Sequence, residues 1–346
     1  MKRFLAMILT AFVLGGLLTV PSALCQDYST NGQQKLAQTG FNFLGVSSDA
    51  RAGAMGDAVT SIQSYVGALS HNPSTMADIP SLLSIDCSIN SWIADIKYLE
   101  LDAVVSPLSG RYGVIGLTLQ SVDFGDVEGT MVWPNAQGYV DTQVMDPSAL
   151  AVGIAYADMV STQFGVGGQV QLAYQSLGES VVQGTGNTLT TKQNVANTLV
   201  YSFGTIYKTG IKSLAFGMSI RNFSQDVKYE QESFSLPLTF TFGVSANVLD
   251  FVEMGGPKQS FVVSCDLSHP TSHPEQLKIG AEYNFMNVIA LRGGYITGDS
   301  EDGITYGVGI SSSGLGISAA NFNVDYSYTP FGVFNNVQRF TVSFSL

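Results

Sequence analysis

The chain has three histidines, and two of them, His269 and His273, stand four residues apart in the run Ser-His-Pro-Thr-Ser-His-Pro. On a helix this spacing places two imidazoles on one face, where they can bind a zinc ion. Pro270 and Pro274 exclude a helix in this run, because proline lacks a backbone donor and clashes with the preceding turn. The sequence therefore predicts a polar loop here and no metal site.

Catalytic motifs are absent as well. The sequence holds no Gly-x-Ser-x-Gly nucleophile elbow and no Walker phosphate loop. It has only scattered near-misses to a dinucleotide loop. One of them, Gly165-Val166-Gly167-Gly168, falls in the middle of a predicted strand, where small residues let side chains from the plug approach closely. We therefore expect no enzyme, no catalytic residue and no cofactor. A hydrolase built from Ser and His at strand edges is the alternative.

Glu282 and Arg292 have a spacing that indicates a contact between strands. They lie on two predicted strands joined by a three-residue turn centred on Asn287. In that register the two residues stand directly opposite each other, on the face that points into the lumen of a barrel. We interpret them as a lumenal charge pair that holds neighbouring strands together, in preference to a substrate contact.

The elements that must position these residues are strands, because apolar and polar residues alternate from Leu82 to the end of the chain. Clear examples are the run Leu-Ser-Ile-Asp-Cys-Ser-Ile-Asn at 83–90 and the closing run Arg-Phe-Thr-Val-Ser-Phe-Ser-Leu at 339–346. The pattern predicts fourteen strands, near residues 82–92, 96–106, 111–121, 149–160, 163–175, 198–208, 213–222, 236–247, 259–267, 276–285, 288–297, 303–311, 317–328 and 338–346.

The lengths of the links between strands alternate. Long links follow the third, fifth and seventh strands, at 122–148, 176–197 and 223–235, while most links after even-numbered strands are brief. Bacterial outer-membrane barrels have short periplasmic turns and long extracellular loops, so this alternation places both ends of the barrel in the periplasm. Two links fit poorly, since 93–95 is short for an extracellular loop and 248–258 is long for a periplasmic turn.

The N-terminus predicts export. Lys2 and Arg3 precede an apolar stretch from Phe4 to Val20, and small residues before a cut after Cys25 define a signal peptide over residues 1–25. A lipoprotein, with Cys25 as the first mature residue, is the alternative, although the bulky Leu24 disfavours it. The formal charge of −12 becomes −14 without Lys2 and Arg3, which excludes electrostatic binding of nucleic acid.

Composition distinguishes a membrane barrel from a soluble β-sandwich, which also alternates apolar and polar residues. Mean hydropathy is +0.21, only 12% of residues are charged, and the polar faces of the predicted strands hold few charges. The sequence predicts an all-β fold, a fourteen-stranded antiparallel transmembrane β-barrel over residues 82–346, with bacterial outer-membrane lipid as its surroundings. Cys87 and Cys265, the mature cysteines, are expected to be free thiols that face lipid.

Residues 26–81 do not alternate and predict an N-terminal plug or cap of the lumen. Asp49 can cap a short helix that runs through Ala50 to Met55 and ends at Gly56. Asn72 followed by Pro73 gives an N-cap with proline at the first helical position. Inside a barrel, the polar backbone of such a segment can find partners on the wall.

Three stretches of the chain resemble the PorV/PorQ family of outer-membrane proteins. They are the string Phe-Leu-Gly-Val-Ser-Ser-Asp-Ala-Arg-Ala-Gly-Ala-Met-Gly-Asp-Ala at 43–58 with His-Asn-Pro-Ser-Thr-Met-Ala at 71–77, the strands around 279–283 and 290–295, and the segment 325–332 that leads to Arg339. The resemblance implies a fourteen-stranded barrel similar to the FadL long-chain fatty-acid transporters. The residues that match the signature in the plug segment are Asp49, Arg51, Gly53, Gly56, Asp57, Asn72 and Pro73.

The signature allows two interpretations of its charged residues. Arg51 and Asp57 could attach the plug to the lumen wall. Alternatively, Asp49 and Asp57 only cap and end a helix, and Arg51 is solvated.

The resemblance and the predicted barrel together leave three hypotheses about function. PorV-type proteins serve the type IX secretion system, so the resemblance implies partners in the type IX translocon and in the C-terminal signal domains of exported cargo. The second hypothesis is a FadL-like transporter of small hydrophobic molecules, which needs an apolar pocket between plug and wall. The Ala and Gly residues at lumen-facing positions in 149–157 would leave room for one. The third is a purely structural barrel.

Overall fold

The structure is a computed structural model that describes residues 39–183, 189–229, 232–252, 258–298, 303–315 and 320–346. The predicted signal peptide, residues 1–25, lies outside the described residues.

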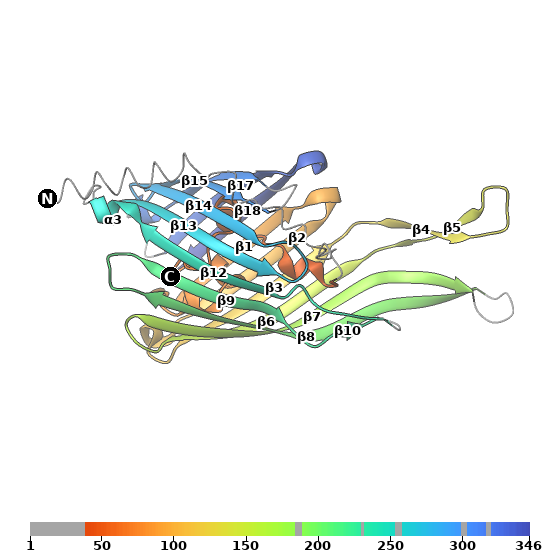
Figure 1. The fold of residues 1–346 in the computed structure, drawn as a ribbon, viewed down its shortest axis with the longest axis horizontal. Coiled ribbons are helices and arrows are strands. Elements are labelled where there is room, and N and C mark those ends of the chain that lie inside the picture. Colours follow the sequence, from red (N-terminus) through yellow and green to blue (C-terminus); the bar gives the residue numbers. More distant parts are fainter. Residues whose placement is uncertain (1–38, 184–188, 230–231, 253–257, 299–302, 316–319) are drawn as a thin grey trace, which may run out of the picture.

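Fourteen antiparallel strands form one closed barrel, in which the first strand pairs with the last (Figure 1). This confirms the predicted fold class and strand number, and every predicted strand has its counterpart. The barrel strands are β1 (Leu83–Ser91), β2 (Lys97–Val105), β3 (Val114–Asp123), β6 (Ser148–Met159), β7 (Phe164–Gln183), β8 (Leu189–Lys208), β9 (Ala215–Phe223), β12 (Thr239–Asn247), β13 (Gln259–Pro270), β14 (Gln276–Phe285), β15 (Ile289–Ile296), β16 (Ile304–Ser311), β17 (Asn321–Pro330) and β18 (Asn336–Ser345).

The outer wall of the barrel is apolar and the inner wall carries small or polar residues. On β6, Ile154 and Tyr156 point outward and are more than half exposed, while Ala151 and Ala155 point inward and are buried. On β1 the inward residues are polar, and Asp86 and its inward neighbours are buried. An apolar outer wall is what a transmembrane barrel presents to lipid. Among the described residues, no helix is both long and apolar enough to span a membrane.

One end of the barrel, here called the hairpin rim, carries strands that extend beyond it (Figure 1). They are β4 (Val127–Val132) paired with β5 (Tyr139–Met145), the outer halves of β7 and β8, and the short β10 (Val227–Lys228) paired with β11 (Ser233–Phe234). The opposite end, the turn rim, joins strands at 160–163, 209–214 and 286–288. The prediction of three long loops was therefore wrong in part, because most of 122–148 and 176–197 is paired as strands.

Short helical pieces complete the fold. The links between strands contain η4 (Ile93–Asp95), η5 (Pro107–Gly110), η6 (Ser313–Leu315), η7 (Gly332–Phe334) and α3 (Val248–Val252), the last in the long link predicted at 248–258. The segment 39–81, here called the plug, contains η1 (Asn42–Gly45), α2 (Ala50–Ala54), η2 (Val66–Ala68) and η3 (Pro73–Met76).

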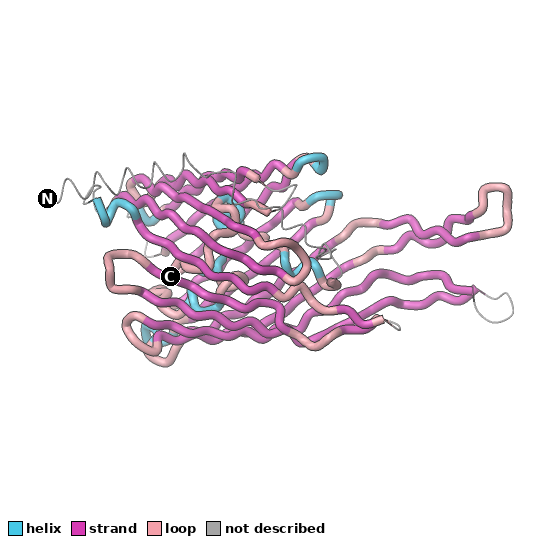
Figure 2. Tube along the Cα trace, viewed as in Figure 1, coloured by secondary structure: helices cyan, strands magenta, loops and turns pink. Residues whose placement is uncertain are grey.

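The plug lies against the inner wall on several sides. Its helix α2 contacts β15 to β18, η2 contacts β1 and β2, and η3 contacts β6 to β8. Figure 2 shows these helical pieces among the strands of the barrel. Residues 26–38 of the predicted plug segment lie outside the described residues.

Two smaller predictions need correction. His269 is not in a loop, because β13 continues to Pro270 and pairs His269 with Phe240. The glycine-rich run at 165–168 lies at the beginning of β7 rather than in the middle of a strand. Both described cysteines are free, with Cys87 exposed and Cys265 half-buried.

Candidate functional site

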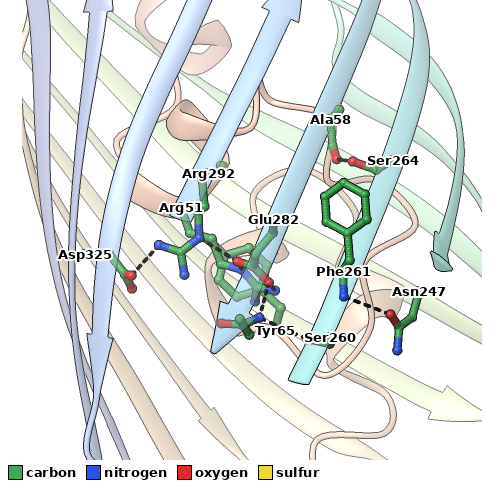
Figure 3. Close-up of polar contacts among 12 residues, drawn as sticks. Arg51, Ala58, Tyr65, Asn247, Ser260, Phe261, Ser264, Glu282, Arg292 and Asp325 are labelled. Atoms are coloured by element: carbon green, nitrogen blue, oxygen red, sulfur yellow. Dashed lines mark hydrogen bonds and ion pairs between the residues drawn. The ribbon is translucent and has the colours of Figure 1, made fainter. Parts of the chain in front are cut away.

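Side chains of the barrel wall bind the backbone of the plug. Buried carbonyl groups need hydrogen-bond partners, and the plug has little regular structure to supply them. Ser264 Oγ donates to the carbonyl of Ala58 at 2.5 Å, as Figure 3 shows, and Thr305 Oγ1 donates to that of Ala54 at 2.9 Å. Asn90 Nδ2 and Arg339 Nε both donate to the carbonyl of Ser47 at 3.0 Å. The polar inner face thus has a specific occupant, the plug.

Glycines on the wall let the plug approach closely. A Cβ at Gly167 on β7 would lie 2.6 Å from both the Pro73 carbonyl carbon and the Ser74 nitrogen of η3, closer than real Cβ contacts occur. Across the barrel, a Cβ at Gly294 on β15 would overlap the backbone between Met55 and Gly56. These glycines provide the shape into which the plug packs.

We expect Gly167→Ala to destabilise the barrel by about 1–3 kcal/mol, the usual cost of overpacking a well-packed site. The obstructing atoms belong to the backbone, which cannot move aside as a flexible side chain can. Thermal unfolding of the purified protein measures the effect. The fraction unfolded at each temperature is read from the heat-dependent mobility shift of folded barrels on gels.

Gly168→Ala is the matched control, since the next residue faces outward. Its Cβ would meet the Phe203 ring at 3.6 Å and the Ser202 carbonyl oxygen at 3.9 Å, both ordinary contacts. Alanine in place of glycine lowers the conformational entropy of the unfolded chain. This variant should therefore be at least as stable as the parent. Equal effects of the two substitutions would contradict a close fit between plug and wall.

A chain of charges joins the plug to three strands (Figure 3). Arg51 of α2 donates from Nε and Nη2 to Glu282 of β14, at 2.8 Å and 2.7 Å. Arg292 of β15 donates to the same carboxylate at 2.5 Å and to Asp325 of β17 at 2.5 Å. A bidentate arginine pair of this kind is geometrically specific as well as strong. We refer to Arg51, Glu282, Arg292 and Asp325 as the plug latch.

The register of β14 and β15 places Glu282 directly opposite Arg292, with the turn centred where the sequence indicates. The sequence did not reveal that Arg51 would complete the pair from the plug. Its side chain is only 22% exposed and lies over the ring of Tyr65, 4.5 Å from the ring centroid. Arg51 is therefore not a solvated residue. What the plug latch does for the protein stays a prediction.

The other signature residues organise the plug itself. Asp49 caps α2 by accepting from the Ala52 nitrogen at 2.6 Å, and it also accepts from the Tyr65 hydroxyl. Asn72 caps η3 by accepting from the Ser74 nitrogen at 3.1 Å, next to Pro73 at the first position. Gly56 has a φ of +62°, a backbone conformation that side chains disfavour.

Gly53 and Asp57 face a different part of the lumen from the plug latch. A Cβ at Gly53 would lie 2.6 Å from Nη1 of Arg339, so the glycine makes room for that guanidinium. Asp57 lies beside His71, with 3.7 Å between Oδ1 and Nε2. Arg51 and Asp57, which lie close together in the sequence, therefore line different pockets.

Burial and nearby charges decide the ionisation of the Asp57 and His71 pair. Burial lowers the pKa of His71 below its usual value, and the neighbouring Asp57 offsets only part of this effect. Burial also opposes ionisation of Asp57, but His71, Lys278 and Arg339 outweigh it and lower the pKa of Asp57. At neutral pH His71 is therefore neutral and Asp57 is ionised.

The plug separates two polar pockets, one at each end of the lumen. The pocket at the turn rim has a volume of about 390 Å³ and is lined by the plug latch, Tyr65 and several serines. The pocket at the hairpin rim, here called the rim pocket, has a volume of about 300 Å³. Its lining includes Asp57 and three cationic residues, Arg221, Lys278 and Arg339. None of the three was predicted as a site residue, although Arg339 follows one of the matched stretches and all three fall on the inward side of predicted strands.

An apolar region lies beside the rim pocket, inside the hairpin end of the barrel. Phe41 and Phe43 of the plug fill it, with ring centroids 5.9 Å apart. We call it the apolar chamber, and its buried lining consists of Tyr98, Val122, Ala149, Ala151, Ala173, Ala196, Val200, Val227 and Leu236. Phe43 is the first residue of the matched string at 43–58 and Phe41 lies just before it, but neither was predicted as a site residue.

The predicted empty space along 149–157 is occupied in this structure. Ala149 and Ala151 belong to the apolar chamber, where the two phenylalanines pack, and Ala155 and Ala157 pack with Leu69 and Met76 of the plug. The small residues of the wall do leave space in the lumen, and side chains of the plug occupy it. The described residues contain no group of three or more His, Cys, Asp or Glu side chains that could hold a metal ion.

No family model matches the chain, and no curated protein matches its sequence. Solved structures do match its fold. The toluene transporter TbuX of Ralstonia pickettii is 14% identical, with a TM-score of 0.56 over 85% of this chain and 96% of that one. The toluene transporter TodX of Pseudomonas putida is 13% identical, with a TM-score of 0.52 over 90% and 98%. A FadL homologue of Pseudomonas aeruginosa is 11% identical, with a TM-score of 0.52 over 86% and 97%.

At such low identity these likenesses show the fold alone. The chain has the FadL-type fourteen-stranded barrel, and its apolar outer wall and fold are those of a bacterial outer-membrane protein. The likenesses do not distinguish the PorV/PorQ family from other barrels of this fold. That finer resemblance stays a prediction.

Proposed function

We propose that this protein carries small hydrophobic molecules across the outer membrane. The apolar chamber is the observation that carries the proposal. The lumen contains a second apolar cluster, around Leu69 and Met76 of the plug, but the apolar chamber is the one at the end where a molecule from outside would arrive. Small alanines and valines form its wall, and two phenylalanine rings occupy its interior. A small aromatic hydrocarbon offers the same surface as those rings.

The backbone conformation of Phe41 supports the proposal that a ligand can displace its ring from the chamber. Phe41 has a φ of +55°, in the left-handed region that a bulky residue rarely adopts. Such a conformation costs of order 1–3 kcal/mol and persists only where packing holds it. A rearrangement that returned the Phe41 backbone to an extended conformation and withdrew its ring would relieve this strain, which would lower the cost of opening the chamber to a ligand.

The fold is consistent with the proposal. TbuX and TodX, two proteins with the same barrel, are described as toluene transporters. Between plug and wall, the present chain places a polar pocket at each rim and the apolar chamber beside the outer one. A hydrophobic molecule would enter the chamber first and would then need the plug to move.

Uptake by whole cells tests the proposal. A deletion strain should accumulate radiolabelled toluene, supplied at low concentration, more slowly than the parent, and the wild-type gene should restore the rate. An outer-membrane barrel of unrelated specificity, expressed at the same level, is the control for general permeability. Equal uptake by the parent and deletion strains would contradict the proposed function.

A role in type IX secretion is the second candidate, and the paired strands at the hairpin rim favour it. They extend beyond the barrel, where they expose apolar side chains such as Val132, Val144 and Leu189. Exposed apolar surface outside the membrane suits a protein partner. With the signature at 43–58, this supports binding of the C-terminal signal domains of cargo and of the translocon.

The second candidate predicts a different phenotype. The deletion strain would accumulate unprocessed cargo in the periplasm and would lose proteins from its surface, while uptake of toluene would stay normal. Mass spectrometry of periplasmic and surface fractions detects that outcome. A purely structural barrel would leave both secretion and uptake unchanged.

A further inference from the structure

The rim pocket concentrates positive charge in an acidic protein. The whole chain has a formal charge of −12, yet the pocket is lined by Arg221, Lys278 and Arg339 against one carboxylate, that of Asp57. Its lining therefore carries two positive charges in excess, in a concave site with low-dielectric walls. Such a site raises the local concentration of anions.

Two donors that line the pocket, on Lys278 and Arg221, have no acceptor among the described residues. No hydrogen bond or ion pair joins the amine of Lys278 to any residue in the described ranges. Within the same ranges, the buried Nε of Arg221 lacks a partner, while its Nη1 donates to the carbonyl of Ser70 at 3.1 Å. Unmet donors in a partly desolvated site are costly unless an acceptor enters. An anionic oxygen is the acceptor that suits both groups.

Aromatic side chains line the same pocket. The rings of Trp92 and Phe331 lie 5.3 Å apart between centroids, and both face the pocket from the hairpin rim. The guanidinium of Arg339 lies 5.7 Å from the Trp92 ring centroid, which adds a cation to the aromatic surface. The two rings meet edge to face, at an interplanar angle of 61°. The pocket thus pairs unmet cationic donors with an aromatic corner that a ligand ring can contact.

We propose that the rim pocket binds a small aromatic carboxylate, with the carboxylate against Lys278 and Arg221 and the ring against Trp92 and Phe331. The volume of about 300 Å³ lies at the small end of ligand pockets, which suits a single-ring molecule. The apolar chamber is a separate site, so the proposal does not depend on transport of hydrocarbons. Failure of the uptake experiment would leave it unaffected.

Tryptophan fluorescence tests the proposal with benzoate as the probe. The chain has two tryptophans, and Trp133 lies in the link between β4 and β5, away from the pocket. In a Trp133→Phe background, benzoate should change the emission of Trp92 saturably in the full-length protein in detergent. Benzamide, which has the same ring and no charge, should bind at least tenfold more weakly, a difference of about 1.4 kcal/mol.

Lys278→Gln should weaken benzoate binding about tenfold, the effect of losing one charge-assisted hydrogen bond. Lys212→Gln is the matched control, because Lys212 is exposed at the turn rim. Arg221→Gln serves as a second test if Lys278→Gln fails to give the compact gel form of a folded barrel. Equal affinity for benzoate and benzamide, or parental affinity in both variants, would overturn the proposal.

Discussion

Replacement of Glu282 by alanine is expected to destabilise the folded barrel by about 3 kcal/mol, at the lower end of the cost of breaking a buried ion pair. The carboxylate is 1% exposed and accepts hydrogen bonds from Arg51, Arg292 and Asn284. Its removal leaves the positive charge of Arg51 without its carboxylate partner and creates a cavity beside it. Arg292 keeps its ion pair with Asp325. Urea unfolding of the protein in lipid vesicles measures the change in free energy.

Glu275→Ala is the matched control for Glu282→Ala. Glu275 forms an ion pair with His269 at 3.0 Å, but both side chains are more than half exposed. An exposed pair contributes only about 0–1 kcal/mol. If Glu282→Ala costs no more than Glu275→Ala, the plug latch does not hold the plug.

A double-mutant cycle separates the pair from its surroundings. The effects of Arg51→Ala and Glu282→Ala should be strongly non-additive, because each substitution removes the same two hydrogen bonds. Additive effects would assign the cost to packing rather than to the bond between plug and wall. The cycle therefore tests whether Arg51 attaches the plug through Glu282.

Phe43→Ala is expected to destabilise the protein by about 3–5 kcal/mol and to create a binding site for toluene. The ring is 2% exposed and packs in the apolar chamber, so its removal leaves an apolar cavity. Apolar cavities of this kind stay dry and bind small aromatic molecules. Saturating toluene should raise the unfolding midpoint of the variant more than that of the parent.

Phe203→Ala controls for the loss of an aromatic ring elsewhere. Phe203 is 54% exposed on the outer wall, where lipid or detergent fills the space that its ring leaves. Toluene should therefore not rescue this variant selectively. A similar rescue of both variants would indicate a general solvent effect and would contradict a specific chamber.

The barrel could be predicted because lipid imposes a strict pattern on the sequence. A strand that spans a membrane must present apolar side chains outward at every second residue, as β6 does from Leu150 to Tyr156 and β18 from Phe340 to Phe344. The outer halves of β7 and β8 were missed for the same reason. They extend beyond the membrane, and most residues of β8 from Leu189 to Val195 are exposed on both faces, so no alternation marks them.

The candidate site could be predicted only where local spacing determines it. The pairing of Glu282 with Arg292 follows from a short turn, and the caps at Asp49 and Asn72 follow from residue type. The contact of Arg51 with Glu282 spans 231 positions in the chain, and no local rule encodes it. The same holds for Phe43, whose partners come from distant strands.

The central claim is that the apolar chamber binds small hydrophobic molecules. Crystals soaked with bromobenzene would test this claim most directly. The anomalous signal of bromine locates the ligand without reference to the rest of the map. We predict a peak within the chamber, close to Ala151 and Val200, with the ring of Phe41 or Phe43 displaced. Peaks confined to the detergent around the outer wall, with both phenylalanines unmoved, would contradict the account.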